Sequence, residues 1–313
     1  MLDGPGSFGP GRARATRSSG RAPAVVGMVA AVAGWLAIVL LTEPFGREWG
    51  TGQDARAYWS SALSDPYRFS SWGEHGAYLY SPAFLQIVSP LALLPWQAFV
   101  GAWCALSIVA LRALTGSRWL ALGVAVAAME LAGGNISLLL AAAIVAGFRW
   151  PAAWAFVLLT KVTPGIGLLW FALRGEWRSL AIALVATVAV VAASVLLLPG
   201  AWGEWLTVLG RNAGRDGTWA AVPLPLWARL PVAAAIVAWG ARTDRRWTVP
   251  VAAMLALPAL WYGSLAMLLA VLALRGDAPA RPATNPAAGA DAPDRAGRPD
   301  VSGPITEPSP APA

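Results

Sequence analysis

Residues 43–81, EPFGREWGTGQDARAYWSSALSDPYRFSSWGEHGAYLYS, separate two apolar runs and concentrate the polar chemistry of the chain. The segment contains the only histidine, His75, and four of the five tyrosines. Its five acids are Glu43, Glu48, Asp54, Asp65 and Glu74. A loop of this length is uncommon unless it is functional or disordered, and its nine aromatic residues argue against disorder. We therefore expect this segment to be folded and functional.

The composition excludes an ordinary soluble domain. Of the 313 residues, 57% are hydrophobic and 12% are charged, whereas charged residues make up about 25% of soluble domains. This predicts an all-α polytopic membrane protein. The net charge of +7 does not predict a nucleic-acid partner, because the arginines form short clusters between apolar runs. The single cysteine, Cys104, lies in an apolar run, so neither a disulfide framework nor a metal site is expected.

The two ends of the chain differ from the apolar domain at residues 24–275. Residues 1–23 are rich in Gly, Arg and Ser and predict a disordered basic arm, and the Pro/Ala-rich residues 276–313 predict a disordered tail. Residues 24–42 are apolar and long enough to cross the membrane. No small-x-small cleavage site follows them, which favours a retained span over a signal peptide. The positive-inside rule then places both termini in the cytoplasm of a plasma-membrane protein and residues 43–81 outside.

The remaining apolar runs predict further crossings. Residues 82–95 are interrupted at Pro90 and are short, so we expect them to lie at the membrane interface. A turn is expected at residues 133–135 and a second outer loop at residues 199–225. The predicted spans are residues 96–114, 119–132, 136–148, 180–198 and 226–241.

Two apolar runs, residues 150–173 and 247–274, carry arginines at both ends. By the positive-inside rule both ends of each run lie on the cytoplasmic side, so each run must cross the membrane an even number of times. We expect pairs of short helices that meet at residues 160–164 and at Pro258. Irregular backbone at membrane depth is tolerated only when it is buried in protein or faces a watery cavity. The prediction is a bundle of about 8–10 membrane or half-membrane helices with a large first outer loop.

Asp54 is the candidate catalytic residue of the first outer segment. A carboxylate just outside the membrane, with aromatic residues to exclude water, suits a general base that takes a proton from a sugar hydroxyl. The alternative is a solvated loop aspartate or a helix cap.

Lys161 is the only lysine of the chain, and it lies in the middle of the apolar run at residues 150–173. An ionisable group at such depth is costly and is a functional hypothesis by default. A compact ammonium suits a phosphate, so a lipid phosphate is its natural partner. The alternative is a snorkelling or ion-paired structural lysine.

Other polar residues are weaker candidates. Glu130 could bind an acceptor or pair with Lys161 or an outer arginine. Arg211 and Arg215 of the second outer loop could hold a phosphate or be solvated, and His75 could contact a sugar. The chain has no phosphate-binding glycine loop, zinc-ligand spacing or nucleophilic serine elbow.

Several short landmarks occur in a fixed order along the chain: Asp54 with Tyr58, Tyr80 to Pro82 leading to Pro90–Pro95, Gly133 to Asn135, Lys161 with Pro164, and Pro258 with Trp261 and Tyr262. Together they resemble glycosyltransferase family 87, the DUF2029 group of polyprenol-phosphate-dependent mannosyltransferases with the GT-C fold. The chain departs from the family pattern at Ser81, where a second proline is usual, at Gly134, where glutamine is frequent, and near Trp261, where a histidine is common.

The resemblance implies transfer of a hexose, with mannose as the first candidate, from a polyprenyl-phosphate donor to a glycolipid or glycan acceptor. The implied transfer inverts the anomeric configuration. It implies no cofactor, nucleotide sugar or obligatory metal. Asp54 would deprotonate the acceptor, and Lys161 with Arg211 or Arg215 would stabilise the departing phosphate. The substrate-binding candidates are Tyr58, His75, Tyr80, Glu130, Asn135 and Tyr262.

Two other classes of function compete with this one. The broken helices also occur in transporters, which predicts a transporter or flippase of lipid-linked sugars. A transporter should show related halves, and no convincing internal repeat is present. The departures from the family pattern leave a non-catalytic membrane scaffold as the third hypothesis.

Overall fold

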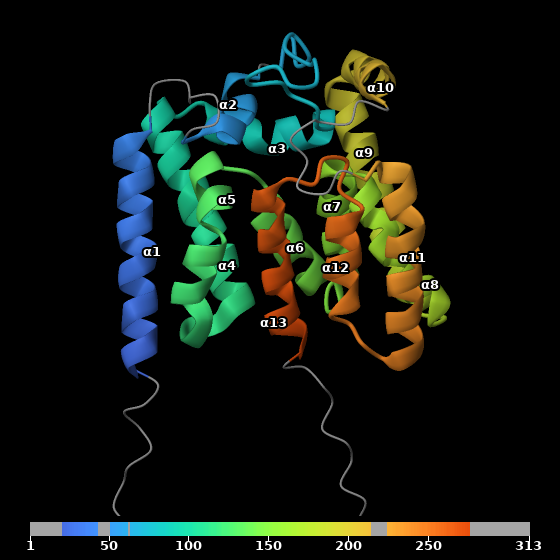
Figure 1. The fold of residues 1–313 in the computed structure, drawn as a ribbon. Helices are drawn as coiled ribbons and strands as arrows, with labels where there is room; N and C mark the ends of the chain where they lie inside the picture. The colour runs from blue at the N-terminus through green and yellow to red at the C-terminus, as the bar shows by residue number, and fades with distance from the viewer. Residues whose placement is uncertain (1–20, 43–50, 62, 214–223, 276–313) are drawn as a thin grey trace, which may run out of the picture. The chain divides into compact units, whose positions relative to one another are not determined.

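The structure, a computed structural model, describes residues 21–42, 51–61, 63–213 and 224–275, all within the unit formed by Met1–Asp277. These ranges contain helices and no β-strand (Figure 1), which confirms the predicted all-α class. The predicted tail and the first 20 residues of the predicted arm lie outside them.

The α-helices are α1 (Arg21–Leu41), α2 (Gln53–Ser60), α3 (Pro82–Ala92), α4 (Trp96–Val126), α5 (Ala128–Gly133), α6 (Ser137–Gly147), α7 (Trp154–Thr160), α8 (Leu169–Leu173), α9 (Trp177–Leu197), α10 (Pro199–Asn212), α11 (Leu226–Thr243), α12 (Thr248–Leu255) and α13 (Ala270–Arg275). The 3-10 helices are η1 (Pro151–Ala153), η2 (Thr163–Leu168) and η3 (Tyr262–Leu269).

Within the described ranges, three helices are long and apolar enough to cross a membrane, namely α1, α4 and α9. Helices α1 and α9 expose most of their apolar surface, as expected for helices that face lipid. Helix α1 packs on α4, where Trp35 Nε1 donates to the Gly101 carbonyl at 2.8 Å. A Cβ on Gly27 would lie 2.9 Å from Leu120 Cβ, so a small residue permits this close approach.

Helix α4 reverses direction at Gly116, whose backbone is not helical (φ 66°, ψ 178°). After the reversal, Gly123 packs against the first half of α4. A Cβ on Gly123 would lie 2.9 Å from Thr115 Cγ2 and 3.0 Å from Leu111 Cδ1. Helix α5 continues the second half after a break at Ala127. The helices predicted at residues 96–114 and 119–132 are therefore present as a helical hairpin.

Both predicted helix pairs are present. Helix α7 ends at Thr160, Lys161 is extended (φ −139°, ψ 112°), and η2 with α8 continues from Thr163. In the second pair α12 ends at Leu255, and η3 with α13 begins at Tyr262. The bundle therefore holds two breaks of irregular backbone, at Lys161 and around Pro258.

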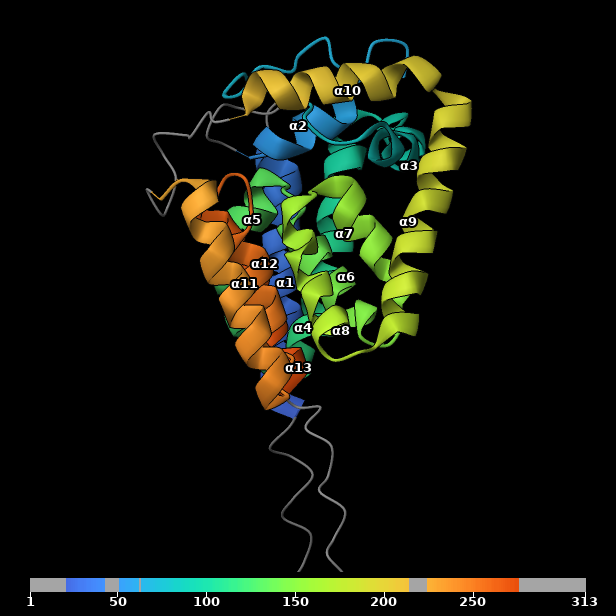
Figure 2. The same ribbon diagram turned by 90° about the vertical axis from the view of Figure 1, so that its right-hand side faces the viewer.

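Three helices, α2, α3 and α10, lie at one end of the bundle, across the direction of the membrane-crossing helices (Figures 1 and 2). Ser81 caps α3 by accepting from the Phe84 amide at 3.3 Å, and its hydroxyl donates to the Leu159 carbonyl at the end of α7. The entry of α3 is therefore tied to the first broken pair.

The sequence-based expectations were wrong at three places in these outer elements. Helix α3 is not interrupted at Pro90, because the Gln86 carbonyl, which loses its amide donor there, accepts from the Ser89 hydroxyl at 3.1 Å. The first outer segment contains helix α2, and the second outer loop begins with helix α10. Helix α10 buries Ala201, Trp205 and Val208, a helical spacing that the loop prediction overlooked.

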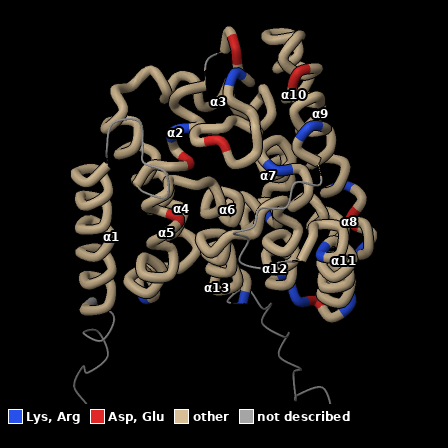
Figure 3. Tube along the Cα trace, turned by 45° about the horizontal axis from the view of Figure 1, so that its top comes forward, with Lys and Arg blue, Asp and Glu red and all other residues tan. Residues whose placement is uncertain are grey.

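The two sides of the bundle differ in charge. Basic residues gather at the ends of α8, α11 and α13, on the side opposite α10 (Figure 3). Several of these arginines lie over aromatic rings, for example Arg245 over Trp239 at 4.8 Å and Arg275 over Trp247 at 5.1 Å. Helix α1 begins and α13 ends on this same side (Figure 1). The described part of the chain therefore begins and ends on one side of the bundle, which agrees with an even number of crossings.

Arg229 of α11 secures the second break. The side chain is 4% exposed. Its guanidinium donates to the carbonyls of Leu255 (2.6 Å), Leu257 (2.8 Å) and Pro258 (3.1 Å). These carbonyls follow the end of α12, where no helical amide reaches them. Arg229 therefore replaces the missing backbone hydrogen bonds.

Arg229→Met should lower the thermal stability of the protein in detergent, because each buried carbonyl left unpaired costs about 1–3 kcal/mol. Arg242→Met, in the exposed last turn of the same helix, is the matched control and should change the melting temperature little. Equal melting temperatures for the two variants would contradict the role assigned to Arg229.

Candidate functional site

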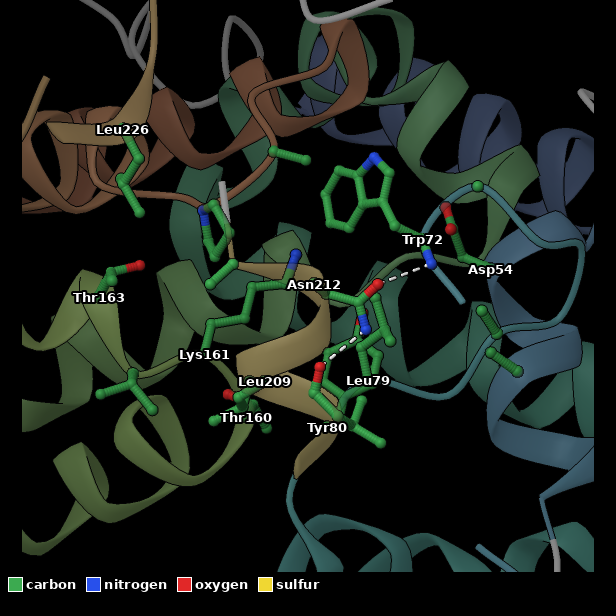
Figure 4. Close-up of a pocket in the computed structure, with 18 of the residues that line it drawn as sticks. Asp54, Trp72, Leu79, Tyr80, Thr160, Lys161, Thr163, Leu209, Asn212 and Leu226 are labelled. Atoms are coloured by element: carbon green, nitrogen blue, oxygen red, sulfur yellow. Dashed lines mark hydrogen bonds between the residues drawn. The ribbon is translucent and has the colours of Figure 1, made fainter. Parts of the chain in front are cut away.

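A cavity of about 700 Å³ lies between the outer helices and the two breaks. Its walls come from α2, the 72–80 segment, the Asn135 turn, the Lys161 break, α10, the start of α11 and residues 258–261. Asp54 and Lys161 both line it, so the expectation that they share one cavity is confirmed (Figure 4).

Asp54 is positioned by the turn that precedes α2. Gly52 has a left-handed conformation (φ 81°), and its amide donates to the Ala132 carbonyl at 2.7 Å. A Cβ on Gly52 would lie 2.7 Å from Trp96 Cζ2, so glycine is required for this approach. Asp54 follows in the first turn of α2, with Oδ2 3.3 Å from the place of a Cβ on Gly133. Helix α2 therefore presents the carboxylate directly over the Gly133 turn.

The Gly133–Asn135 turn supports this carboxylate. Gly134 is left-handed (φ 69°), and a Cβ there would lie 2.7 Å from Ala55 Cβ of α2. Trp103 Nε1 donates to the Gly134 carbonyl at 2.8 Å. The Asn135 side chain accepts from the Ile136 amide at 2.6 Å and forms a hydrogen bond with Asp54. The amide of Asn135 thus orients Asp54 in the cavity.

The environment of Asp54 suits a base near neutral pH. Burial raises the pKa of Asp54 to about 6, while the positive charge of Lys161 and the hydrogen bond from Asn135 act in the opposite direction. The side chain keeps part of its surface on the cavity, although protein surrounds it on the other sides. A carboxyl group with this pKa is mostly ionised at pH 7 and still accepts a proton readily.

Lys161 extends from the break between α7 and η2 into the cavity, with Thr163 to one side and Asp54 across from it (Figure 4). Its amine lies over the Tyr80 ring, 5.9 Å from the centroid. Its charge interacts with Glu130 and Asp54. Within the described part of the chain, no carboxylate oxygen comes within 4.0 Å of this amine. The ammonium is therefore balanced by two acids without a salt bridge to either.

Comparison of the sequence with models of known protein families identifies the family of this chain. The model of glycosyltransferase family 87 matches residues 78–290, which is more than half of the chain. The chain belongs to glycosyltransferase family 87. No curated protein and no solved structure matches it. The protein is therefore a membrane glycosyltransferase, and the matched residues include Lys161, whereas the segment with Asp54 precedes them.

Two tyrosines, Tyr58 and Tyr80, form a layer beside Asp54 and Lys161. The hydroxyls of Tyr58 and Tyr80 are 3.0 Å apart, and Tyr58 is 0% exposed. Tyr80 lines the cavity, whereas Tyr58 lies behind it. Burial raises the pKa of both hydroxyls further above the ordinary tyrosine value. Both hydroxyls stay protonated, so neither competes with Asp54 as a base.

Glu130 lies under the cavity wall and is not among the residues that line the cavity. It is 1% exposed, and its Oε1 accepts from the Ser137 amide at 2.6 Å at the start of α6. This position does not bring Glu130 to an acceptor. Its charge interacts with that of Lys161, but within the described residues no salt bridge joins the two side chains.

The other predicted site residues are dispersed. His75 lines the outer part of the cavity. Arg211 is not a lining residue, and its guanidinium donates to Ser70 Oγ at 3.3 Å. Tyr262 is 62% exposed and lies outside the cavity, which its neighbour Trp261 lines. Arg215 lies outside the described residues.

The sequence did not predict that helix α10 covers the cavity. Asn212 of α10 accepts from the Trp72 amide and donates to the Ser70 carbonyl, each at 2.9 Å. Trp205 Nε1 donates to the Leu79 carbonyl at 3.2 Å. These bonds fasten α10 to the first outer segment over Asp54. The helical spacing of residues 201, 205, 208 and 212 was the signal that could have found them.

The cavity has two chemically different ends. Under the first outer segment it is polar and aromatic, with Trp72, Glu74 and His75 in the wall. Near the start of α11 the wall is apolar, with Leu226, Trp227 and Leu230, and Val162 and Trp227 are 51% and 77% exposed. A polar wall beside an apolar one suits a molecule that carries both kinds of surface.

Proposed function

We propose that this glycosyltransferase moves a hexose such as mannose from a polyprenyl-phosphate donor to a glycolipid or glycan acceptor on the extracytoplasmic face. The observation that carries the proposal is the shared cavity of Asp54 and Lys161, polar at one end and apolar at the other. A lipid-linked donor has a matching division into an apolar chain and a polar sugar phosphate. A nucleotide sugar has no apolar chain to place between Val162 and Trp227.

In the proposed reaction Asp54 takes the proton of an acceptor hydroxyl. The hydroxyl oxygen attacks the anomeric carbon of the hexose from the face opposite the phosphate, and the bond between that carbon and the phosphate oxygen breaks. The electron pair leaves with polyprenyl phosphate, whose growing negative charge the Lys161 ammonium stabilises. One displacement of this kind inverts the anomeric configuration. The protein needs no cofactor for these steps.

Family membership favours this transferase over the transporter and the scaffold considered above. The two broken helix pairs that motivated the transporter instead supply the wall that holds Lys161 and Trp261. Helical breaks at membrane depth therefore build a reaction chamber in this protein.

We place the cavity on the outer side of the plasma membrane, with both termini cytoplasmic, because the arginine-rich helix ends lie on the opposite side of the bundle. A cysteine introduced at exposed Ser64, with Cys104 replaced, should react with a membrane-impermeant maleimide on intact cells. Labelling only after lysis would reverse the orientation.

The test of the function is transfer by the purified protein in lipid vesicles with membrane glycolipids as acceptors. Labelled mannose should be transferred from polyprenyl phosphomannose and not from a nucleotide-linked mannose, and the product should have the inverted anomeric configuration. Transfer from the nucleotide sugar alone would overturn the proposed donor, and a retained configuration would overturn the single displacement.

A further inference from the structure

Two hydrogen-bonding groups in the cavity wall have no partner within the described ranges. They are the Thr163 hydroxyl and the Trp261 indole N–H, and both atoms are buried. We infer that Thr163 and Trp261 bind oxygen atoms of the lipid-linked donor, Thr163 at the phosphate and Trp261 at the sugar. This inference rests on the proposed function and names two further binding residues for the same site.

Thr163 belongs to the phosphate end of the site by position. It follows Lys161 by two residues, at the start of η2, and both side chains line the same part of the cavity (Figure 4). A hydroxyl beside an ammonium adds a second donor to a phosphate oxygen. The two residues therefore form a short phosphate-binding segment at the first break.

Trp261 belongs to the end where the sugar reacts. Its ring edge, at Cη2, lies 3.5 Å from the place of a Cβ on Gly133, and Asp54 Oδ2 lies 3.3 Å from the same place. The indole N–H only donates, so its partner must be an oxygen acceptor. Near the base Asp54 that acceptor is a hydroxyl of the hexose.

The orientation of Trp261 is set by the protein itself. The indole lies against the backbone of Gly263, where a Cβ would collide with the ring atom Cζ2. Gly133 supports the ring from another side. Two glycines thus leave room for the indole and hold it in place, so its N–H is oriented before a substrate binds.

Buried groups without a partner also occur away from the cavity, so the missing partner alone does not make a site. Ser264 is 0% exposed and its hydroxyl likewise has no partner in the part of the chain described, but it does not line the cavity. It lies three residues from Trp261 and serves as the matched control. Thr163 and Trp261 differ from it because their side chains line the cavity.

The experiment compares Thr163→Val, Trp261→Phe and Ser264→Ala in the full-length protein. Thr163→Val should weaken binding of polyprenyl phosphate about 10-fold or more, because the side-chain shape is kept and one hydrogen bond to the ligand is lost. Trp261→Phe should leave that affinity unchanged and raise the KM for the sugar-bearing donor by a similar factor. Ser264→Ala should change neither quantity.

Melting temperature separates ligand binding from a structural role. Thr163→Val removes a hydroxyl that has no partner among the described residues, so its melting temperature should be unchanged or higher. Trp261→Phe also removes ring atoms that pack against Gly263, so its melting temperature should fall, and the KM decides its role. A lower melting temperature with unchanged affinity and KM would overturn the inference, and so would two variants that match the wild type in every measurement. If the wild type neither binds polyprenyl phosphate nor transfers from it, the proposed function fails together with this inference.

Discussion

Replacing Asp54 by asparagine should lower kcat by about 10²- to 10⁴-fold, the usual contribution of a general base. Asparagine keeps the size of the side chain and can still accept the hydrogen bond from Asn135, but it cannot take a proton from the acceptor. Donor binding should be preserved, because the Lys161 ammonium proposed to hold the phosphate is unchanged. Transfer of labelled hexose at saturating donor measures the loss.

The matched control is Asp65→Asn. Asp65 is an exposed acid of the same outer segment and does not line the cavity. Its replacement should leave kcat within a factor of about two, since an exposed substitution away from the site has little effect. Full activity of Asp54→Asn would remove Asp54 as the base.

The activity of the wild type should depend on pH through Asp54. Its pKa is about 6, above the ordinary aspartate value, because of burial. The base form is the ionised carboxylate, so kcat/KM should rise as pH increases from 5 to 7 and level off above that range. A flat profile across this range would show that another group, or none, controls the proton transfer.

Replacing Lys161 by methionine should lower kcat/KM by about 10²- to 10³-fold, the effect of removing one group that stabilises developing negative charge. Methionine keeps the unbranched apolar stem and removes only the ammonium. Its loss should weaken binding of polyprenyl phosphate as well as slow the reaction. Arg118→Met, an arginine over the Trp119 ring and away from the cavity, is the control and should retain activity.

The same variant should also shift the pH profile. The positive charge of Lys161 lowers the pKa of Asp54 against the effect of burial, so its removal should raise that pKa further. The rise in activity should therefore move to higher pH in Lys161→Met. A reduced rate with an unshifted profile would indicate that Lys161 and Asp54 do not interact in the working enzyme.

The fold class and the order of the membrane elements were predictable from the sequence. Apolar length and the placement of arginines depend only on local composition, because lipid requires every crossing segment to be apolar and internally hydrogen-bonded. The two broken pairs were predictable for the same reason, since Arg149 and Arg174 cannot lie at opposite sides of the bilayer. Lys161 stood out because it is the only lysine and lies in an apolar run.

The outer helices were less predictable. Helix α2 is short, and helix α10 follows the apolar α9 with only one residue between them, so neither has the length that marks a membrane span. Their stability comes from contacts with distant segments, such as the bonds between Asn212 and residues 70–72. Long-range contacts of this kind leave little trace in a local pattern.

The sequence by itself determined that this protein is an all-helical membrane glycosyltransferase of family 87, because hydropathy, charge and motif order are properties of the chain read in one dimension. Only the tertiary structure decided which polar residues meet. It brings Asp54 of the first outer segment to Lys161 of the first break, and it leaves Glu130, Arg211 and Tyr262 out of the cavity. The reason is geometric: glycine contacts at Gly52, Gly133 and Gly134 set how closely α2 approaches the bundle.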